Sequence, residues 1–161
     1  MYLKPATSSD APIIQELAEH IWRKHYTAII GEVQVSYMLQ KIYAIPALEK
    51  HISEGVQQFF VLMDDTVPIG FIAFELKDDG TGFIHKFYIL QTQQRRGLGA
   101  AAFRLLKQEF PDTTNISLQV NRQNYQAINF YFKMGFVIEQ VADFDIGDGY
   151  FMNDFIMRWM K

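Results

Sequence analysis

Two short turns, at residues 64–65 and 78–80, most constrain how this chain of 161 residues can fold. They separate three apolar segments with a strand-like pattern, 57–63, 67–76 and 82–90. Asp-Asp and Asp-Asp-Gly are turn-forming clusters, and links this short join neighbouring strands that run antiparallel. The sequence therefore predicts an antiparallel three-stranded meander in the middle of the chain.

The segments on either side of the meander add helices and further strands. A first helix is expected to begin after Asp10, because a capping side chain is followed by Pro12 in the first turn. Because a helix separates the last meander strand from the next strand, these two strands are expected to be parallel. The prediction is a single-domain mixed α/β sheet over residues 1–161. Further helices are expected at 33–44, 46–55, 97–110 and 125–134, and further strands at 115–120, 136–145 and 150–160.

Charge and cysteine content exclude several classes of function. The formal net charge of −3 argues against a general nucleic-acid binder. Residues 94–133 nevertheless carry a net charge of +4 between flanks of −4 and −3. Such a segment can hold an anion on one side and a cation on the other, although the charge counts alone favour a chance distribution over a solvated surface. The absence of cysteine removes disulfides, thiolate metal sites and a cysteine nucleophile, and the four scattered histidines predict no metal site.

The chain carries no apolar run of signal-peptide or membrane-spanning length. A cytoplasmic protein without a membrane partner is therefore expected. Its oligomeric state, monomer or homodimer, stays open.

The junction between the third strand and the following helix carries Gly97 and Gly99, preceded by Arg95 and Arg96. A strand–glycine–helix junction directs the unpaired N–H groups of the helix toward an anion, and the helix dipole and the arginines strengthen the attraction. Phosphate is the expected ligand.

Two nucleotide-binding patterns fit this junction poorly. Residues 97–102 satisfy the dinucleotide pattern G-x-G-x-x-(G/A), but they follow antiparallel strands. Gln119 stands where an acidic residue would contact the ribose, which argues against NAD and FAD. A P-loop is excluded because no Gly-Lys-Ser/Thr follows.

A third pattern fits better. Residues 94–99, QRRGLG, match (Q/R)-x-x-G-x-(G/A), and they resemble the acetyl-CoA pyrophosphate loop of the GNAT superfamily of N-acetyltransferases. Residues 87–89 resemble the strand end before that loop, although Gln91 stands where the family often has proline. Residues 124–136, NYQAINFYFKMGF, resemble the second family motif, N-x-x-A-x-x-F-Y-x-x-x-G-F. The resemblance implies the GNAT fold, with a mostly antiparallel sheet, one parallel pair and helices on both faces. It also implies acetyl-CoA as co-substrate and no metal.

The resemblance also implies how coenzyme A is held. The N–H groups of the loop would bind the pyrophosphate, and strand-end backbone groups would bind the pantetheine arm and the acetyl carbonyl. The Ile89 N–H would take the oxyanion role. Asn121 and Asn124 would contact the other side of the arm, although Asn121 can equally cap a loop. The implied cofactor-binding residues are Tyr88, Ile89, Leu90, Gln94, Arg95, Arg96, Gly97, Leu98, Gly99, Ala100, Asn121 and Asn124.

Tyr131 matches the family tyrosine that protonates the departing thiolate, and the resemblance implies that it is the general acid. Its neighbours at helical spacing, Ala127, Phe130 and Met134, leave open the alternative of an ordinary packed aromatic residue.

His85, Asp154 and Glu75 are candidates for the general base. Strand alternation places His85 on one face with Phe83, Phe87 and Ile89, and an imidazole can take a proton from an amine near neutral pH. A core histidine whose hydrogen bonds are satisfied is the alternative. Asp154 is an acid on a mostly apolar strand face, so it should have either a basic partner or a catalytic purpose.

Without cysteine, direct attack by an amine in a ternary complex is favoured over an acyl-enzyme. In the superfamily the acceptor usually meets the N-terminal helices and the last hairpin, which here carry aromatic and acidic residues that can select a small cationic amine. Residues 37–43 and 151–154 are similar to PaiA-like polyamine acetyltransferases. The aromatic residues can instead belong to the core. The alternative functions are a protein or peptide N-acetyltransferase and a non-catalytic CoA-binding regulatory module. The aromatic and acidic residues of the N-terminal helices and the last hairpin are Trp22, Tyr26, Tyr37, Tyr43, Asp143, Asp145, Asp148 and Asp154.

Overall fold

The three segments joined by short turns form the antiparallel meander that the sequence predicts. In the computed structural model, which describes residues 1–93 and 97–161, they are β2 (Gln58–Asp64), β3 (Val67–Leu76) and β4 (Thr81–Ile89). Asp65 adopts a φ of 50° in the tight turn between β2 and β3. Aspartate tolerates this left-handed conformation better than most residues, which is why it suits the turn.

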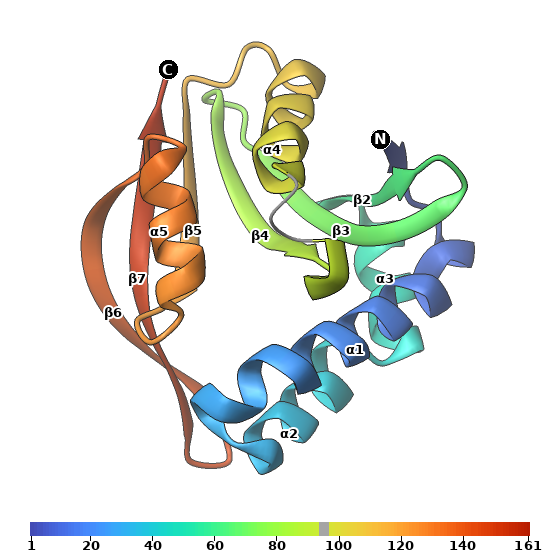
Figure 1. The fold of residues 1–161 in the computed structure, drawn as a ribbon, viewed down its shortest axis with the longest axis vertical. Coiled ribbons are helices and arrows are strands. Elements are labelled where there is room, and N and C mark those ends of the chain that lie inside the picture. The colour runs from blue at the N-terminus through green and yellow to red at the C-terminus, as the bar shows by residue number, and fades with distance from the viewer. Residues whose placement is uncertain (94–96) are drawn as a thin grey trace.

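Among the described residues the sheet has seven strands, in the order β1-β2-β3-β4-β5-β7-β6 (Figure 1). The pair β4–β5 is parallel and the other five pairs are antiparallel, so the sheet is mostly antiparallel with one parallel pair, as expected. The strand β1 was not expected, because its four residues include a proline and are mostly exposed. The remaining strands are β1 (Tyr2–Pro5), β5 (Asn115–Asn121), β6 (Val137–Gly147) and β7 (Tyr150–Met160).

The helices lie close to the positions that their sequence periodicity indicates. Asp10 precedes the first helix, which carries Pro12 in its first turn and ends at Gly31, where φ is 82°. A glycine suits this position because φ is in the left-handed region. The helices are α1 (Ala11–Ile30), α2 (Glu32–Ile42), α3 (Ile45–Glu54), α4 (Leu98–Glu109) and α5 (Tyr125–Lys133).

Each face of the sheet has its own apolar core. The helices α1, α2 and α3 pack on one face, where Phe59, Val61 and Phe71 of the sheet are buried. On the other face α4 and α5 cover a core that includes Ile72 and Leu118 (Figure 1). Helices on both faces, expected from the resemblance, are thereby confirmed.

The parallel strands β4 and β5 pair over only part of their length. Residues 81–84 of β4 pair with residues 115–118 of β5, and the strands separate beyond this point. A β-bulge accompanies the separation, because Ile84 lies opposite Phe74 while Lys86 lies opposite Ala73. The extra residue, His85, interrupts the register, and a bulge bends its strand and increases its twist. The separation leaves room for a site between the two strands.

The bulge corrects the face assigned to His85. Strict alternation predicts that His85 shares a face with Phe83, Phe87 and Ile89, yet Phe87 and Ile89 pack into the core beneath α4 and α5. Lys86, the residue after His85, points to the other side of the sheet from Phe87 and Ile89. Its ammonium group lies over the ring of Phe59, in the core beneath α1–α3. The register shift therefore leaves His85 beside Phe83 and places the next apolar residues on the opposite face.

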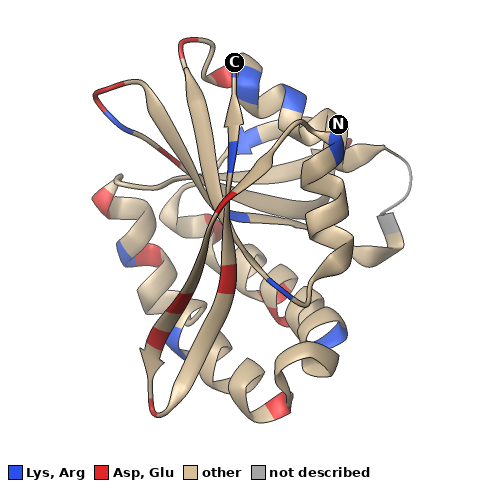
Figure 2. Ribbon diagram, turned by 90° about the vertical axis from the view of Figure 1, so that its left-hand side faces the viewer, with Lys and Arg blue, Asp and Glu red and all other residues tan. Residues whose placement is uncertain are grey.

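Acidic residues lie along the β6–β7 hairpin, as Figure 2 shows from the side of that hairpin. Among residues 1–93 and 97–161, every helix is too short or too polar to cross a membrane.

Candidate functional site

A cleft of about 430 Å³ occupies the space between β4 and β5. Residues of α1, the end of β4, the beginning of α4, the end of β5 and most of α5 line it. The bulge and the separation of β4 from β5 therefore create a cavity that reaches from α1 to the space between α4 and α5.

The first turn of α4 forms one wall of the cleft. Gly97, Leu98, Gly99 and Ala100 all line it, and the Ala101 N–H is the first in this helix to bond back to Gly97 (N···O 3.0 Å). The first N–H groups of a helix have no partner within the helix, so those of Leu98, Gly99 and Ala100, together with the helix dipole, favour an anion. The geometry supports the phosphate site that the sequence predicts at this junction.

The two glycines of this turn serve different purposes. Gly97 has a φ of 73°, and a Cβ built there would have no atom within 4 Å, so the position is open but demands a left-handed backbone. A Cβ at Gly99 would lie 2.9 Å from the Phe130 ring, so the missing side chain lets α4 approach α5. The expected contacts of Gln94, Arg95 and Arg96 lie outside the described residues.

The end of β4 forms a second wall. Tyr88 and Ile89 line the cleft, as expected for residues next to a pantetheine arm. The Leu90 N–H donates to the Ile69 carbonyl of β3 (2.9 Å), and the Leu90 side chain packs on the α1–α3 side. Leu90 therefore packs on the α1–α3 side of the sheet and does not line the cleft.

Tyr131 lies on α5 and lines the cleft although only 8% of it is exposed. Its ring packs against Phe130 and Phe136, with centroid separations of 5.2 and 5.4 Å. Burial raises the pKa of the Tyr131 phenol well above its usual range. The side chain is thus both a packed aromatic and a hydroxyl that keeps its proton at neutral pH.

Asn121 and Asn124 differ in what their side chains do. The Asn121 Oδ1 accepts the Gln123 N–H (2.9 Å), so this side chain caps the loop after β5. Asn124 begins α5: its Oδ1 accepts the Ala127 N–H (3.2 Å), and its Nδ2 donates to the Tyr26 hydroxyl (3.3 Å). Asn124 also lines the cleft and is 5% exposed. The structure thus brings Asn124, but not Asn121, to the cleft wall.

His85 is engaged away from the cleft wall. Its Nε2 lies 2.8 Å from a Glu75 carboxylate oxygen, and both side chains are about one-quarter exposed. Burial lowers the pKa of His85, although the Glu75 carboxylate opposes this shift. The structure therefore joins two of the three candidate bases into one pair beside the bulge.

Asp154 is a buried carboxyl group on β7, 5% exposed. It makes no hydrogen bond or ion pair with any residue that the structure describes, because Arg122 instead binds Asp143. The pKa of Asp154 is raised to about 6, mainly by burial; the charge of Arg122 opposes this shift and that of Asp143 adds to it. The alternative of a direct ion pair is thus not realised within residues 1–93 and 97–161.

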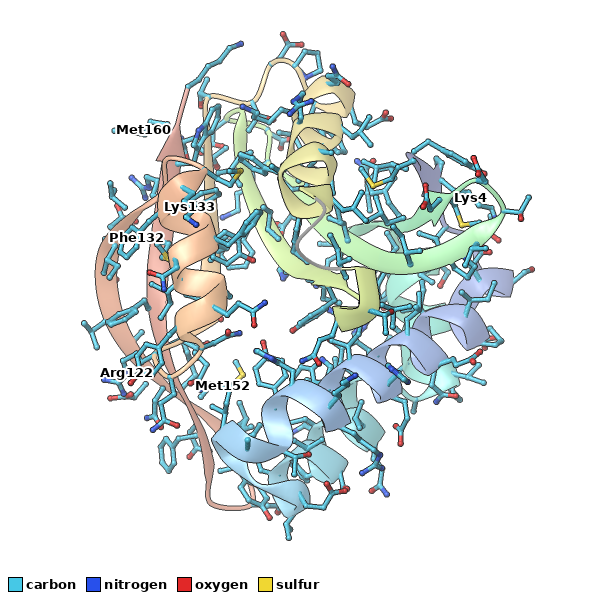
Figure 3. All side chains as sticks on the ribbon, viewed as in Figure 1. Lys4, Arg122, Phe132, Lys133, Met152 and Met160 are labelled. Atoms are coloured by element: carbon cyan, nitrogen blue, oxygen red, sulfur yellow. The ribbon has the colours of Figure 1, made fainter. Side chains whose placement is uncertain are left out.

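Asp154 lies on the side of the sheet that faces α1. Met152, two residues earlier on β7, packs in the core beneath α1–α3 and lies between β7 and α1 in Figure 3. The charge of Asp154 also acts on the phenol of Tyr26, which lines the cleft. The carboxyl group therefore lies close to the α1 end of the cleft.

The sequence patterns did not single out several residues of the cleft. His25 of α1 counted only as one of the scattered histidines and Lys133 of α5 only as charge, whereas Tyr26 was already a candidate aromatic residue for the acceptor. One sequence signal could have identified Lys133: it lies at helical spacing from Phe130 and Ala127, and therefore on the same side of α5. Nothing in the sequence shows that α1 crosses the end of β4.

The comparisons with known proteins identify the family and the fold. The model of the acetyltransferase (GNAT) family matches residues 14–136. The chain is similar in structure to a PaiA N-acetyltransferase from Thermoplasma acidophilum in complex with coenzyme A, with a TM-score of 0.83, 22% identity and coverage of 100% of both chains. It is also similar to a spermidine N-acetyltransferase SpeG chimera from Vibrio cholerae and hSSAT (TM-score 0.73, 21% identity, 98% and 93% covered). A third similar structure is an aminoglycoside acetyltransferase AAC(6')-Ib in complex with coenzyme A, with a TM-score of 0.69, 19% identity and coverage of 99% of this chain and 94% of that chain.

Proposed function

The chain belongs to the acetyltransferase (GNAT) family, and from that premise we propose that it acetylates a small cationic amine, such as a polyamine, by direct attack in a ternary complex. Membership makes it an acetyl-CoA-dependent N-acetyltransferase. One observation carries the proposal: a single cleft joins the open N-terminus of α4 to Tyr131 and to the α1 side, near Asp154.

The residues of the cleft suit coenzyme A. The N–H groups at the beginning of α4 would hold the pyrophosphate, and the separated strand β4, with Tyr88 and Ile89, would flank the pantetheine arm. Acetyl-CoA supplies the activated acetyl group and a thiolate leaving group. Direct transfer is supported because the chain has no cysteine to carry the acetyl group.

Tyr131 is proposed as the general acid. Transfer needs a proton for the departing thiolate, and a buried phenol with a raised pKa retains one. Its position on the cleft wall, on the helix that Asn124 caps, supports the role.

Asp154 is the stronger candidate for the base that deprotonates the amine, directly or through water. With a pKa of about 6 its carboxyl group is mostly ionised at neutral pH, and it lacks a basic partner among the described residues. His85 remains the second candidate, because its nitrogen is held by Glu75 and it does not line the cleft.

The preference for a cationic acceptor rests on fewer residues than the sequence predicts. Trp22 and Tyr43 are 5% and 2% exposed, so they belong to the core and not to an acceptor surface. Asp143 binds Arg122, and the Asp145 carboxylate accepts the Gly147 N–H (2.8 Å). The buried charge of Asp154 is therefore the main attraction for an ammonium group.

A thiol-release assay with acetyl-CoA tests the proposal against a panel of polyamines, amino acids, aminoglycosides and peptides. We expect kcat/KM to be highest for a polyamine. A preference for peptides would instead indicate a protein N-acetyltransferase. If acetyl-CoA binds and raises the melting temperature but no amine releases thiol, the chain would be a CoA-binding module without turnover. Ligand at about 100 times its Kd stabilises a native protein by about 2.7 kcal/mol, so binding is measurable separately from turnover.

A further inference from the structure

The rim of the cleft carries a lysine, Lys133, to which the acetyl-transfer step assigns no role. Lys133 is the last residue of α5, and it lines the cleft together with Ala127, Phe130 and Met134. These positions recur at spacings of three and four residues, so they form one stripe on the helix. The stripe faces the space between α5 and the beginning of α4.

Lys133 lies near the expected phosphate site. Gly99, in the first turn of α4, approaches Phe130 so closely that a Cβ on the glycine would lie 2.9 Å from the ring. Lys133 follows Phe130 by three residues, which is about 4.5 Å along a helix axis. A lysine side chain can span such a distance. The ammonium group of Lys133 is therefore within reach of an anion that extends outward from the beginning of α4.

The charge of Lys133 is not used elsewhere in the described structure. It forms no ion pair with any aspartate or glutamate of residues 1–93 and 97–161, and its side chain is exposed. Lys107 of α4 differs, because its ammonium group lies over the rings of Phe103 and Trp159, at 5.1 and 4.7 Å from their centroids. Figure 3 shows Lys133 on the side of α5 that faces the viewer, the side on which α4 and α5 cover the sheet.

The length of coenzyme A indicates which of its phosphates meets this lysine. With Tyr131 as the proposed general acid, the thioester end must reach this residue in the buried part of the cleft, and the pyrophosphate would lie at the beginning of α4. The adenosine continues beyond the pyrophosphate, so its 3′-phosphate must lie at the rim. A phosphate monoester carries nearly two negative charges at neutral pH, and lysine binds phosphate as a point charge. We propose that the ammonium group of Lys133 binds the 3′-phosphate of coenzyme A and makes the enzyme selective for the phosphorylated carrier.

Binding of coenzyme A and of 3′-dephospho-coenzyme A, measured by isothermal titration calorimetry, tests the proposal without an acceptor. The wild type should bind coenzyme A more tightly than the dephospho form. Lys133→Met should raise the Kd for coenzyme A by about tenfold or more, as the loss of one charge-assisted hydrogen bond implies, and change the Kd for the dephospho form by less than about twofold. Lys133→Arg should retain the preference. Added salt should reduce the difference between the affinities for the two ligands, because salt screens an exposed charge pair.

Lys50→Met is the matched control, because Lys50 is 71% exposed on α3, across the sheet from α4 and α5, and its loss changes the net charge equally. It should leave both affinities unchanged. Equal weakening of both ligands by Lys133→Met would overturn the proposal, since the lysine would then bind the pyrophosphate or support the cleft. Unchanged affinity for coenzyme A in Lys133→Met would overturn it as well.

Discussion

Tyr131 shows how one side chain serves both the core and the chemistry. Its ring packs against Phe130 and Phe136, while its hydroxyl group keeps its proton because burial raises the pKa. Tyr131→Phe keeps the ring and removes the proton, so kcat should fall by roughly 10²–10⁴ while the Kd for coenzyme A stays nearly constant. Steady-state thiol release and calorimetric binding measure the two quantities. An unchanged kcat would remove Tyr131 from the mechanism.

Asp154 predicts the acidic limb of the pH–rate profile. A base must be ionised to accept a proton, so kcat/KM should decline as the pH falls below about 6, the pKa to which burial raises this carboxyl group. In Asp154→Asn, kcat/KM at neutral pH should fall by roughly 10²–10⁴, and its decline below pH 6 should disappear. The profile is measured between pH 5 and 8, spanning the usual pKa of histidine.

A separate control distinguishes lost catalysis from lost folding. The folded-state pKa of Asp154 is raised, so ionising this group disfavours the folded state at neutral pH. Asp154→Asn should therefore unfold at the same temperature as the wild type or higher. If the limb survives in this variant and vanishes in His85→Gln, the base is His85, and the proposal for Asp154 is wrong.

At the scale of elements, the sequence predicted what local patterns determine. Apolar periodicity located the helices, and short turns determined the meander and its antiparallel pairing. The glycine junction before α4 and the capping Asn124 before α5 are local signals too, and both lie on the cleft wall. This explains why local sequence patterns pointed to residues that line the cleft, where we propose that the phosphate binds.

The bulge at His85 could not be predicted, because it depends on how β3 and β4 align along their whole length. A shift of one residue moves later side chains to the other face of a sheet. Strict alternation therefore put Phe87 and Ile89 on the face of His85 by mistake, although Phe83 does lie beside it. Nor could the sequence show that Arg122 binds Asp143 and not Asp154. Such pairings depend on cross-strand register and on tertiary packing, which periodicity within one segment does not contain.

At the scale of the whole molecule, the bulge places a lysine in the interior. Lys86 is 8% exposed, and its ammonium group lies over the rings of Tyr43 and Phe59, at 5.9 and 5.3 Å from their centroids. Its nearest polar partner is Gln57, whose Oε1 lies 3.4 Å from Nζ. Burial lowers the pKa of Lys86 to about 8. The protein therefore tolerates a cation in its core without a carboxylate partner among the described residues.

This lysine should make stability rise with pH in a defined range. Because the pKa is about 10.5 in the unfolded chain and about 8 in the folded one, the unfolded state binds the proton more strongly between these values. The free energy of unfolding that Lys86 contributes should therefore rise by about 3 kcal/mol from pH 8 to 10.5. Lys86→Met removes this dependence. Its free energy of unfolding should therefore exceed that of the wild type most below pH 8, and the excess should shrink as the pH approaches 10.5. Urea unfolding at several pH values measures the difference. Lys50→Met, at an exposed position, should show no such trend. A pH-independent difference in stability between Lys86→Met and the wild type would show that Lys86 has the same pKa in the folded and the unfolded protein, which would contradict the lowered pKa.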